Sequence, residues 1–390
     1  MTAGHLGHTR GACFISALIC LAIGFAWQAL TVHYNRGGNW SALFLMGSRF
    51  PVPPALASEN PYVFPDSAGY DGQMYHYVAH DPLLRHGFGR YIDSAQLRYR
   101  RILLPASAFL LAGGRQGAID GCFIACNLLF LFFGAWWVGR YLVLSGLSPA
   151  WSILFVATPA AVTSLDRLTV DLSLTALAMG FAYYAKIDSR WRLYAVLVLA
   201  GLSRETGLML IAAYCISRFA QRRFLQAVLY STAVLPTGLW YLYVNSRTEK
   251  ILGTWFRPPL FGIVTWGIHP FHYQYSLAVN AVITTLDYLS MAGIVMACAL
   301  ALLMLFRNPF GHLEIAAAIW AAMALCFNES FWEDALGGGR VLSAMLIFLI
   351  LLNAARLSIV WCLPLIFVSM RTWLQLVSPL LGIVKGMLHR

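Results

Sequence analysis

The chain has 390 residues, of which 59% are hydrophobic and only 11% are charged. Soluble domains average about 45–50% apolar and about 25% charged residues. This chain therefore has too few polar groups to cover a water-facing surface, which excludes an ordinary cytosolic enzyme and a disordered protein. A multi-pass membrane protein remains. We expect an all-α transmembrane helix bundle of about 9–11 spans, with residues 1–390 forming a single domain.

The formal net charge is +11, from 27 Lys and Arg against 16 Asp and Glu. A basic chain can bind nucleic acid. Here, however, the basic residues lie at the ends of apolar runs, where they orient a protein in its membrane. We expect no nucleic-acid partner. The same rule places the N-terminus and residues 186–192 and 218–223 in the cytoplasm. Most acidic residues then fall on the outer side, so we expect carboxylate chemistry there.

Residues 11–31 form the first apolar run. It is longer than a signal-peptide core and no small-residue cleavage site follows, so we interpret it as a retained span. Residues 33–117 then form a long outer loop, and loops of this length usually carry function. Within that loop, residues 102–113 are apolar but too short to cross a hydrocarbon core of about 30 Å. They predict a helix lying on the membrane surface.

The later apolar runs predict spans that alternate in direction. They are residues 119–139, 151–165, 168–185, 194–202 with 208–216, 224–244, 281–306, 312–327 and 341–353. Residues 203–207 put charges between two half-length runs, which is typical of a re-entrant or broken helix. Residues 246–280 predict a second outer loop. Residues 358–390 are apolar but interrupted by prolines and Arg371, and their sequence does not fix a topology.

The densest group of reactive side chains is residues 69–81. Asp71 precedes an aromatic run that predicts a short helix. Its carboxylate could cap that helix, or it could act as a general base toward a sugar or lipid hydroxyl. Gly72 would leave room for a substrate to approach the backbone. We expect four neighbours to contact substrate: Tyr70, Gln73, Tyr75 and Asp81.

Several arginines and acids elsewhere are candidates for the same site. Arg98, Arg100 and Arg101 form a cluster that favours phosphate, although it could equally be a solvated patch. Arg204 could hold a phosphate that Glu205 orients, or the two could neutralise each other. Three further candidates lie at the ends of predicted spans: Asp166, Asp171 and Arg340. Asp171 would lie about one turn inside its helix, and Arg340 follows three glycines.

Motifs for other reaction classes are missing from the sequence. There is no P-loop, Rossmann fingerprint, HExxH or GxSxG motif, so an ATPase, a dehydrogenase, a zinc protease and a serine hydrolase have no support. The eight cysteines lie in apolar runs without a CxxC pair, and we interpret them as small buried residues. We expect no metal site and no cofactor.

The order of these features resembles the GT-C superfamily of membrane glycosyltransferases, which take sugars from polyprenyl-phosphate carriers. Its members include lipid A aminoarabinose transferases, protein O-mannosyltransferases and GPI mannosyltransferases. The resemblance rests on the first span followed by a long outer loop with Tyr70-Asp71-Gly72-Gln73, on a surface helix after Arg100-Arg101, and on Asp166 after the third span. It also rests on the broken pair at residues 203–207. The first outer loop lacks the contiguous Asp-X-Asp or Glu-X-Asp of many relatives.

The resemblance implies an inverting glycosyl transfer at the outer, periplasmic face of a bacterial cytoplasmic membrane. Asp71 would be the general base, with Asp166 as a second catalytic acid. The donor would be a polyprenyl-phosphate-linked sugar and the acceptor an envelope lipid, glycan or protein. Because polyprenyl phosphate is a good leaving group, the reaction needs no metal. The alternative is a transporter or flippase for a lipid-linked sugar, since broken helices and buried charges also suit transport.

Overall fold

The computed structural model describes residues 3–250, 255–273, 275–333, 336–356 and 358–388. The described chain is all-α apart from two short strands that pair in parallel, β1 (Met46–Gly47) and β2 (Val63–Phe64). The first-half helices are α1 (Ala3–Asn35), α2 (Pro54–Ala57), α3 (Asp71–His80), α4 (Ala95–Arg100), α5 (Leu103–Leu111), α6 (Ile119–Leu144), α7 (Pro159–Arg167) and α8 (Asp171–Lys186). The later helices are α9 (Arg190–Ser203), α10 (Leu208–Ala220), α11 (Phe224–Ser231), α12 (Val234–Asn245), α13 (Phe261–Ile268), α14 (Leu277–Arg307), α15 (His312–Leu325), α16 (Glu329–Glu333), α17 (Gly337–Leu352), α18 (Leu363–Trp373) and α19 (Val377–Leu388).

Short 3₁₀ helices connect these elements. They are η1 (Trp40–Phe44), η2 (Phe88–Tyr91), η3 (Gln116–Ala118), η4 (Pro149–Ala157), η5 (Glu205–Gly207), η6 (Ala354–Arg356), η7 (Ile359–Trp361) and η8 (Leu374–Leu376).

Five helical segments among the described residues are long and apolar enough to cross a membrane. They are Thr9–Asn35, Gln116–Leu144, Phe224–Asn245, Leu277–Arg307 and Leu363–Leu388, and α15 and α17 are shorter apolar helices. Large apolar side chains point outward from several of them, such as Phe14 and Ile15 on α1 and Leu239 and Leu242 on α12. These helices give the chain the character of a membrane protein.

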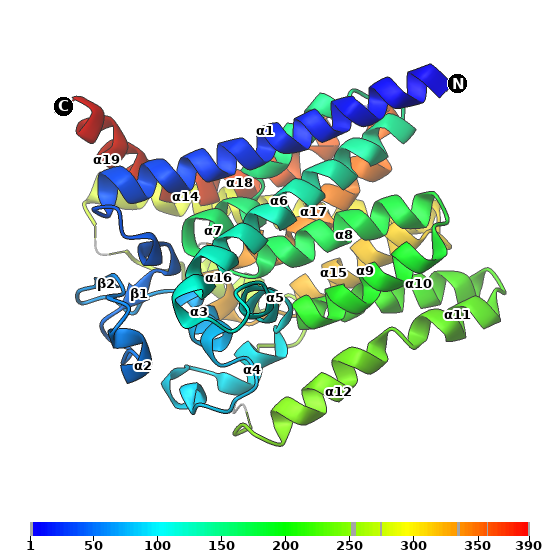
Figure 1. Cartoon of the computed structure of the whole chain (residues 1–390). Coiled ribbons are helices and arrows are strands. Elements are labelled where there is room, and N and C mark those ends of the chain that lie inside the picture. Colours follow the sequence, from blue (N-terminus) through cyan, green and yellow to red (C-terminus); the bar gives the residue numbers. More distant parts are fainter. Residues whose placement is uncertain (1–2, 251–254, 274, 334–335, 357, 389–390) are drawn as a thin grey trace.

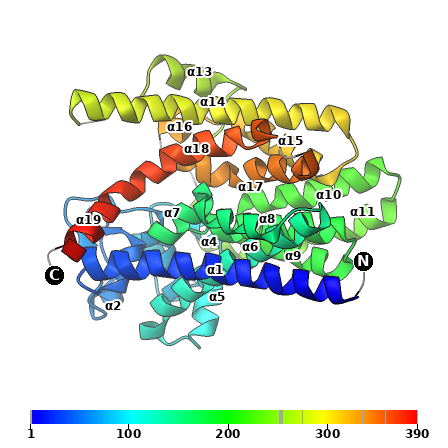
Figure 2. The ribbon, with the colours of Figure 1, turned by 90° about the horizontal axis from the view of Figure 1, so that it is seen from above.

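The long helices run back and forth between two ends of the molecule (Figures 1 and 2). Residues 36–118, with both strands and helices α2 to α5, gather at one end, which we call the loop end. Hydrogen bonds tie short turns together at the opposite end, where Lys186 donates to Ser145 and Ser217 donates to the carbonyl of Phe310. The alternating direction follows the order of apolar runs in the sequence.

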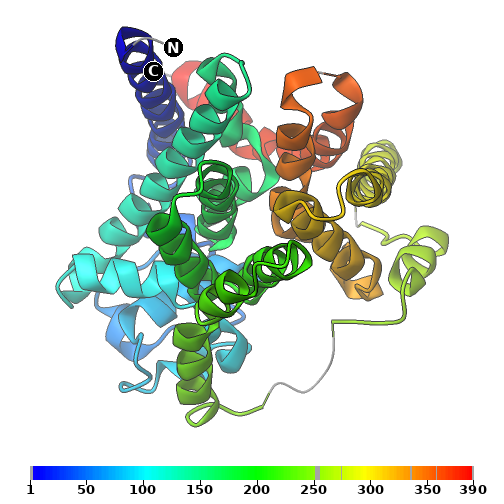
Figure 3. The same ribbon diagram turned by 90° about the vertical axis from the view of Figure 1, so that its right-hand side faces the viewer.

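The first and second halves of the chain form adjacent groups of helices (Figure 3). Helix α17 lies where they meet and packs against α7 and α8 of the first half and α14, α15 and α18 of the second. Its first turn contains Arg340, which therefore reaches acidic residues of the first half.

Two regions differ from, or go beyond, the sequence expectation. The run 151–165 is not one helix, because Pro159 opens a new helix and the preceding residues form the unusually long 3₁₀ helix η4. Residues 363–388 form α18 and α19, and α18 packs along α14. Arg371 of α18 pairs with Asp287 of α14, so its charge is buried with a partner.

Candidate functional site

Asp71 is the first residue of α3, and Tyr70 occupies the N-cap position. From the sequence, Asp71 was one candidate for that cap. The Asp71 carboxylate is therefore not used as the cap. Its Oδ1 atom lies 2.9 Å from a guanidinium nitrogen of Arg98, and Oδ2 accepts a hydrogen bond of 2.5 Å from Arg340. Two arginines from distant parts of the chain thus converge on this acid.

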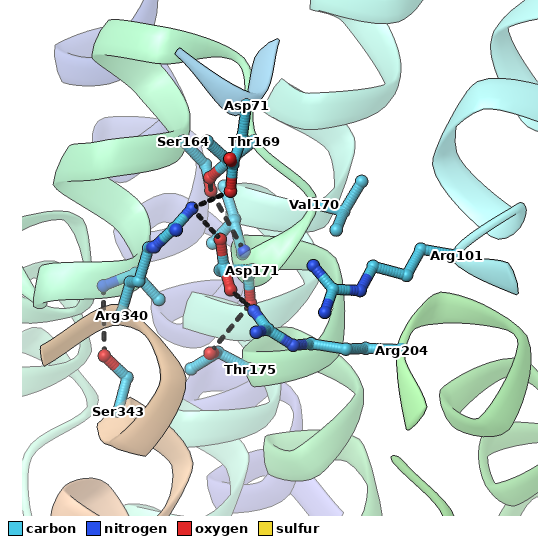
Figure 4. Close-up of polar contacts among 12 residues, drawn as sticks. Asp71, Arg101, Ser164, Thr169, Val170, Asp171, Thr175, Arg204, Arg340 and Ser343 are labelled. Carbon is cyan, nitrogen blue, oxygen red and sulfur yellow. Dashed lines mark hydrogen bonds and ion pairs between the residues drawn. The ribbon is translucent and has the colours of Figure 1, made fainter. Parts of the chain in front are cut away.

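Asp171 is likewise the first residue of its helix, α8, and only 2% of its surface is exposed. It pairs with Arg204, and its other oxygen lies 3.3 Å from the Arg340 nitrogen that holds Asp71 (Figure 4). The turn before α8 is fixed by Ser164, which accepts from the backbone of Leu172. Arg340 consequently bridges two carboxylates from two helices.

Arg101 joins the same region from the end of α4. It donates to both oxygens of Glu205, at 2.9 and 2.5 Å, in the two-pronged geometry that arginine makes with carboxylates. Arg101 also donates to the hydroxyl of Tyr75 at 2.8 Å. Glu205 is therefore chiefly the partner of Arg101, while its sequence neighbour Arg204 turns to Asp171. Arg204 and Glu205 still approach each other at 3.5 Å, but each has a closer partner, so the expected self-neutralising pair is only a secondary contact.

We call this group the arginine–carboxylate cluster. It comprises Arg98, Arg101, Arg204, Arg340, Asp71, Asp171 and Glu205. It brings together four guanidinium groups and three carboxylates, and Asp93 adds a fourth acid at its edge by pairing with Arg98. All four arginine side chains are at least nine-tenths buried. The cluster is therefore a desolvated ion network, in which removing one partner leaves a buried charge.

The pKa of Asp71 follows from this environment. Burial alone would raise the pKa of its carboxyl, but Arg340 and Arg98 together hold it well below its usual range. Burial would lower the pKa of the Arg101 guanidinium, but Glu205 raises it above its usual value. Asp71 is therefore ionised at neutral pH, which is the protonation state that a general base requires.

Tyr70 and Asp166 lie beside the cluster. The Tyr70 ring faces the guanidinium groups of Arg340 and Arg167, at 5.0 and 4.8 Å from its centroid. Asp166 accepts from Trp27 at 3.4 Å and lies 3.5 Å from Arg167. Asp166 thus belongs to a neighbouring group, in which it contacts Trp27 and Arg167.

Three of the residues that we expected at the site lie elsewhere. Gln73 bridges the backbone of Gly47 and the hydroxyl of Tyr77. Asp81 accepts three backbone N–H groups, from residues 85, 86 and 88, and so holds the loop that follows α3. Arg100 donates to Asn245 and thereby joins α4 to α12. We do not carry these three assignments further.

Gly72 has a different task from the one expected. A Cβ atom there would lie 2.1 Å from the carbonyl oxygen of Arg167 and 2.9 Å from that of Phe44. The missing side chain lets the start of α3 pack directly on the turn between α7 and α8. Gly72 therefore brings Asp71 close to Asp171 and makes no room for substrate.

A cavity of about 1060 Å³ opens against the cluster. Arg98 and Asp93 lie in its wall, together with Gln96 and Leu97 of α4, and Arg247 and Asn328 face it from later loops. Its volume exceeds the upper size of ordinary small-molecule pockets, about 1,000 Å³. The cavity gives a large, partly basic space beside Arg98, which contacts Asp71.

Two features were not assigned from the sequence. His76 and His80 of α3 converge with Asp120 of α6, and the signal for the pair was their spacing of four residues. Asp287 and Arg371 pair between α14 and α18, with Tyr273 donating to Asp287. Their separation of 84 residues leaves no local pattern in the sequence.

Comparison of the chain with protein-family models, with curated proteins and with solved structures finds no match. The candidate function therefore depends on the cluster itself and on the resemblance described above.

Proposed function

We propose that the chain is a polytopic membrane glycosyltransferase of the GT-C type, with about 9–11 spans. It would move a sugar from a polyprenyl-phosphate carrier to an envelope lipid, glycan or protein. The reaction would occur at the loop end, facing the periplasm of a bacterial cytoplasmic membrane. One observation carries the proposal: Asp71 and Asp171 share Arg340, and Arg98, which also contacts Asp71, lines the large cavity.

The donor phosphate is the natural competitor for the arginines of the cluster. Guanidinium groups bind phosphate and carboxylate oxygens through the same planar fork. We infer that the phosphate takes contacts from Arg204 and Arg340, which now hold Asp171 and Asp71. Arg340 would then loosen its hold on Asp71, raise the basicity of the carboxylate, and stabilise the charge that develops on the departing phosphate.

Asp71 then acts as the base. It accepts the proton of the acceptor hydroxyl while that oxygen forms a bond to the anomeric carbon. The bond between the anomeric carbon and the phosphate oxygen breaks, and polyprenyl phosphate leaves with the electron pair. Attack opposite the leaving group inverts the anomeric configuration. Asp171 contributes by keeping Arg204 and Arg340 beside the reaction centre, and needs no proton transfer of its own.

The decisive experiment is an assay of the purified full chain with a panel of radiolabelled polyprenyl-phosphate sugars and a membrane extract as acceptor source. We expect transfer from at least one donor. Asp71→Asn keeps the size of the side chain but removes its basicity, so turnover should fall by about 10²–10⁴-fold. Asp66→Asn, at an exposed position in the same loop, is the matched control and should retain normal turnover.

Two outcomes would contradict the proposal. One is normal transfer by a well-folded Asp71→Asn protein. The other is movement of a donor across reconstituted vesicles without any transfer of sugar, which would favour the flippase alternative.

A further inference from the structure

His76 and His80 lie one turn apart on α3, and their Nε2 atoms both point toward Asp120 at the start of α6. The Nε2 atom of His76 is 2.7 Å from Oδ1 of Asp120 and 3.1 Å from Nε2 of His80. The Nε2 atom of His80 is 3.4 Å from the same carboxylate oxygen. Three ligand-type atoms thus form a small triangle, separate from the arginine–carboxylate cluster.

The size of this triangle suits a tetrahedral metal ion. Zinc binds histidine nitrogen and carboxylate oxygen at about 2.0–2.2 Å, so neighbouring ligand atoms in a tetrahedron are roughly 3.3 Å apart. Two of the three separations, 3.1 and 3.4 Å, are close to that value, and the 2.7 Å separation of His76 and Asp120 would have to widen when the ion binds. Two histidines at positions i and i+4 of one helix are also the arrangement by which helices present zinc ligands.

Neighbouring side chains orient His76 and His80 as metal ligands. The Nδ1 atom of His80 lies 2.6 Å from the side-chain oxygen of Gln116, and Glu59 is 4.0 Å from the same nitrogen. A proton on Nδ1 leaves the lone pair of Nε2 facing Asp120, and a metal-bound histidine usually donates its other N–H in this way. The ring of Phe44 stacks on His76 at 4.1 Å between centroids and fixes its orientation.

Access and burial differ between the ligands. His76 and His80 are 2% and 1% exposed, whereas the Asp120 side chain is 23% exposed. An ion can therefore enter past Asp120 and keep one coordination position open to water.

We propose that His76, His80 and Asp120 bind one Zn²⁺ ion, which joins α3 to α6. Asp71 begins α3, and His76 lies five residues later on that helix. The ion would therefore position the helix that carries Asp71, without contacting the reacting groups. This site is independent of the proposed glycosyl transfer, since it requires only the three ligands and their support.

The test uses the full chain in detergent, with any affinity tag removed and bound metal stripped by a chelator. Zinc is then added back, and bound metal is measured by elemental analysis and by competition with a chromogenic indicator. We expect one zinc per chain. We expect Co²⁺ in place of zinc to give the visible absorption bands of a tetrahedral site. Because metal ligands must be unprotonated, zinc binding should weaken in acidic solution.

Substitution of the ligands separates this site from adventitious binding. His76→Gln and His80→Gln should each weaken zinc binding more than tenfold, and His86→Gln, an exposed histidine of the same loop, should bind as the parent does. Elution as a single detergent-solubilised species checks folding. If a ligand variant fails to fold, the zinc stoichiometry and Co²⁺ spectrum of the parent decide. A parent that binds no stoichiometric zinc, or a folded His76→Gln/His80→Gln double variant that binds it as tightly, would overturn the proposal.

Discussion

Arg340 donates to Asp71 and lies close to Asp171, so one guanidinium holds two carboxylates that start different helices. In this state Asp71 is a poor base, because its charge is already neutralised by Arg340 and Arg98. In the proposed reaction, the site would become reactive when the donor phosphate competes for the arginines. Donor binding and base activation would then be coupled, and the acceptor would meet a basic Asp71 after the donor phosphate has bound.

The stability of the protein should report the ion pairs of Asp71 directly. A carboxyl whose pKa is lowered by folding stabilises the folded state above its unfolded pKa, about 3.9, and loses that stabilisation as pH falls toward the folded pKa. At neutral pH, Asp71→Asn should therefore unfold in detergent at a lower temperature than the parent. Below about pH 4 the difference should shrink, because the carboxyl of the unfolded parent takes up a proton while the folded carboxyl stays ionised, which favours unfolding. A difference that stays constant down to about pH 2 would show that the ion pairs of Asp71 contribute little.

Arg204 offers a test of the proposed phosphate contact. Arg204→Lys keeps the positive charge but loses the planar fork, so donor affinity should drop by about tenfold or more, while acceptor affinity changes less. Arg85→Lys, at an exposed position of the first loop, is the control and should leave donor affinity unchanged. Binding is measured by titration with a non-hydrolysable polyprenyl phosphonate. Equal donor affinity in folded Arg204→Ala and parent protein would remove Arg204 from the site.

The sequence predicted the members of the cluster better than their pairing. Asp71, Arg101, Asp171, Arg204, Glu205 and Arg340 were all candidates and all meet. The pairing could not be predicted, because Arg340 and Asp71 are 269 residues apart. Gln73 and Asp81 looked similar to Asp71 in sequence, but local backbone geometry uses their polar atoms. Residue type alone cannot distinguish a polar side chain that holds a loop from one that faces a site.

At the scale of elements, two tight junctions bring the acids together. The start of α3 packs on the turn between α7 and α8, where Leu168 adopts the left-handed conformation with φ of +43°. Gly207 has a similar role at the α9–α10 junction, since a Cβ there would lie 1.9 Å from the carbonyl oxygen of Ala200. At both junctions a glycine without a side chain allows close backbone contact. This contact places the neighbouring charged residue in the cluster.

The junction between α3 and the α7–α8 turn can be tested by mutation of Gly72. Gly72→Ala would push a methyl group into two backbone carbonyls that no rotamer change can move. Overpacking of this kind typically costs about 1–3 kcal/mol. We expect a lower unfolding temperature in detergent and weaker sugar transfer, since the substitution shifts Asp71 relative to Asp171. Gly238→Ala in α12, where a Cβ meets nothing within 4 Å, should be neutral or slightly stabilising. Unchanged stability and activity in Gly72→Ala would contradict this account of the packing.

The sequence predicted most helices but not the interruptions between them. Hydropathy runs through residues 151–165 without a break, so it could not show that Pro159 separates η4 from α7. The last segment, residues 358–390, was ambiguous because Pro364, Arg371 and Pro379 interrupt it. The structure explains how that arginine is tolerated, since Asp287 of α14 neutralises it. That partner is 84 residues away, beyond any local pattern.

At the scale of the whole molecule, composition predicted an all-α chain with apolar helices of membrane-spanning length. A chain that is 59% hydrophobic and 11% charged has little alternative to a helical membrane bundle, and five of its described helical segments have membrane-spanning length. Charge distribution adds an orientation. The basic turns at residues 186–192 and 218–223 lie at the ends of α8 and α10, opposite the loop end (Figure 1). The arginine–carboxylate cluster forms at the other end of α8, since Asp171 begins that helix and Arg204 directly follows α9. From the positive-inside rule we expect the cluster to lie on the outer side of the membrane.

This orientation can be tested by labelling single cysteines in intact bacterial cells. After replacement of the eight native cysteines, Asp66→Cys and Arg190→Cys each place a thiol at an exposed position, the first in the loop end and the second at the opposite end. An impermeant maleimide should label position 66 and should label position 190 only after the cells are broken. A cytoplasmic marker protein, unlabelled in the same cells, checks that the membrane is intact. The reverse pattern would put Asp71 and Arg340 on the cytoplasmic side. The proposed transfer would then have to use a polyprenyl-phosphate donor before it crosses the membrane, together with acceptors made inside the cell.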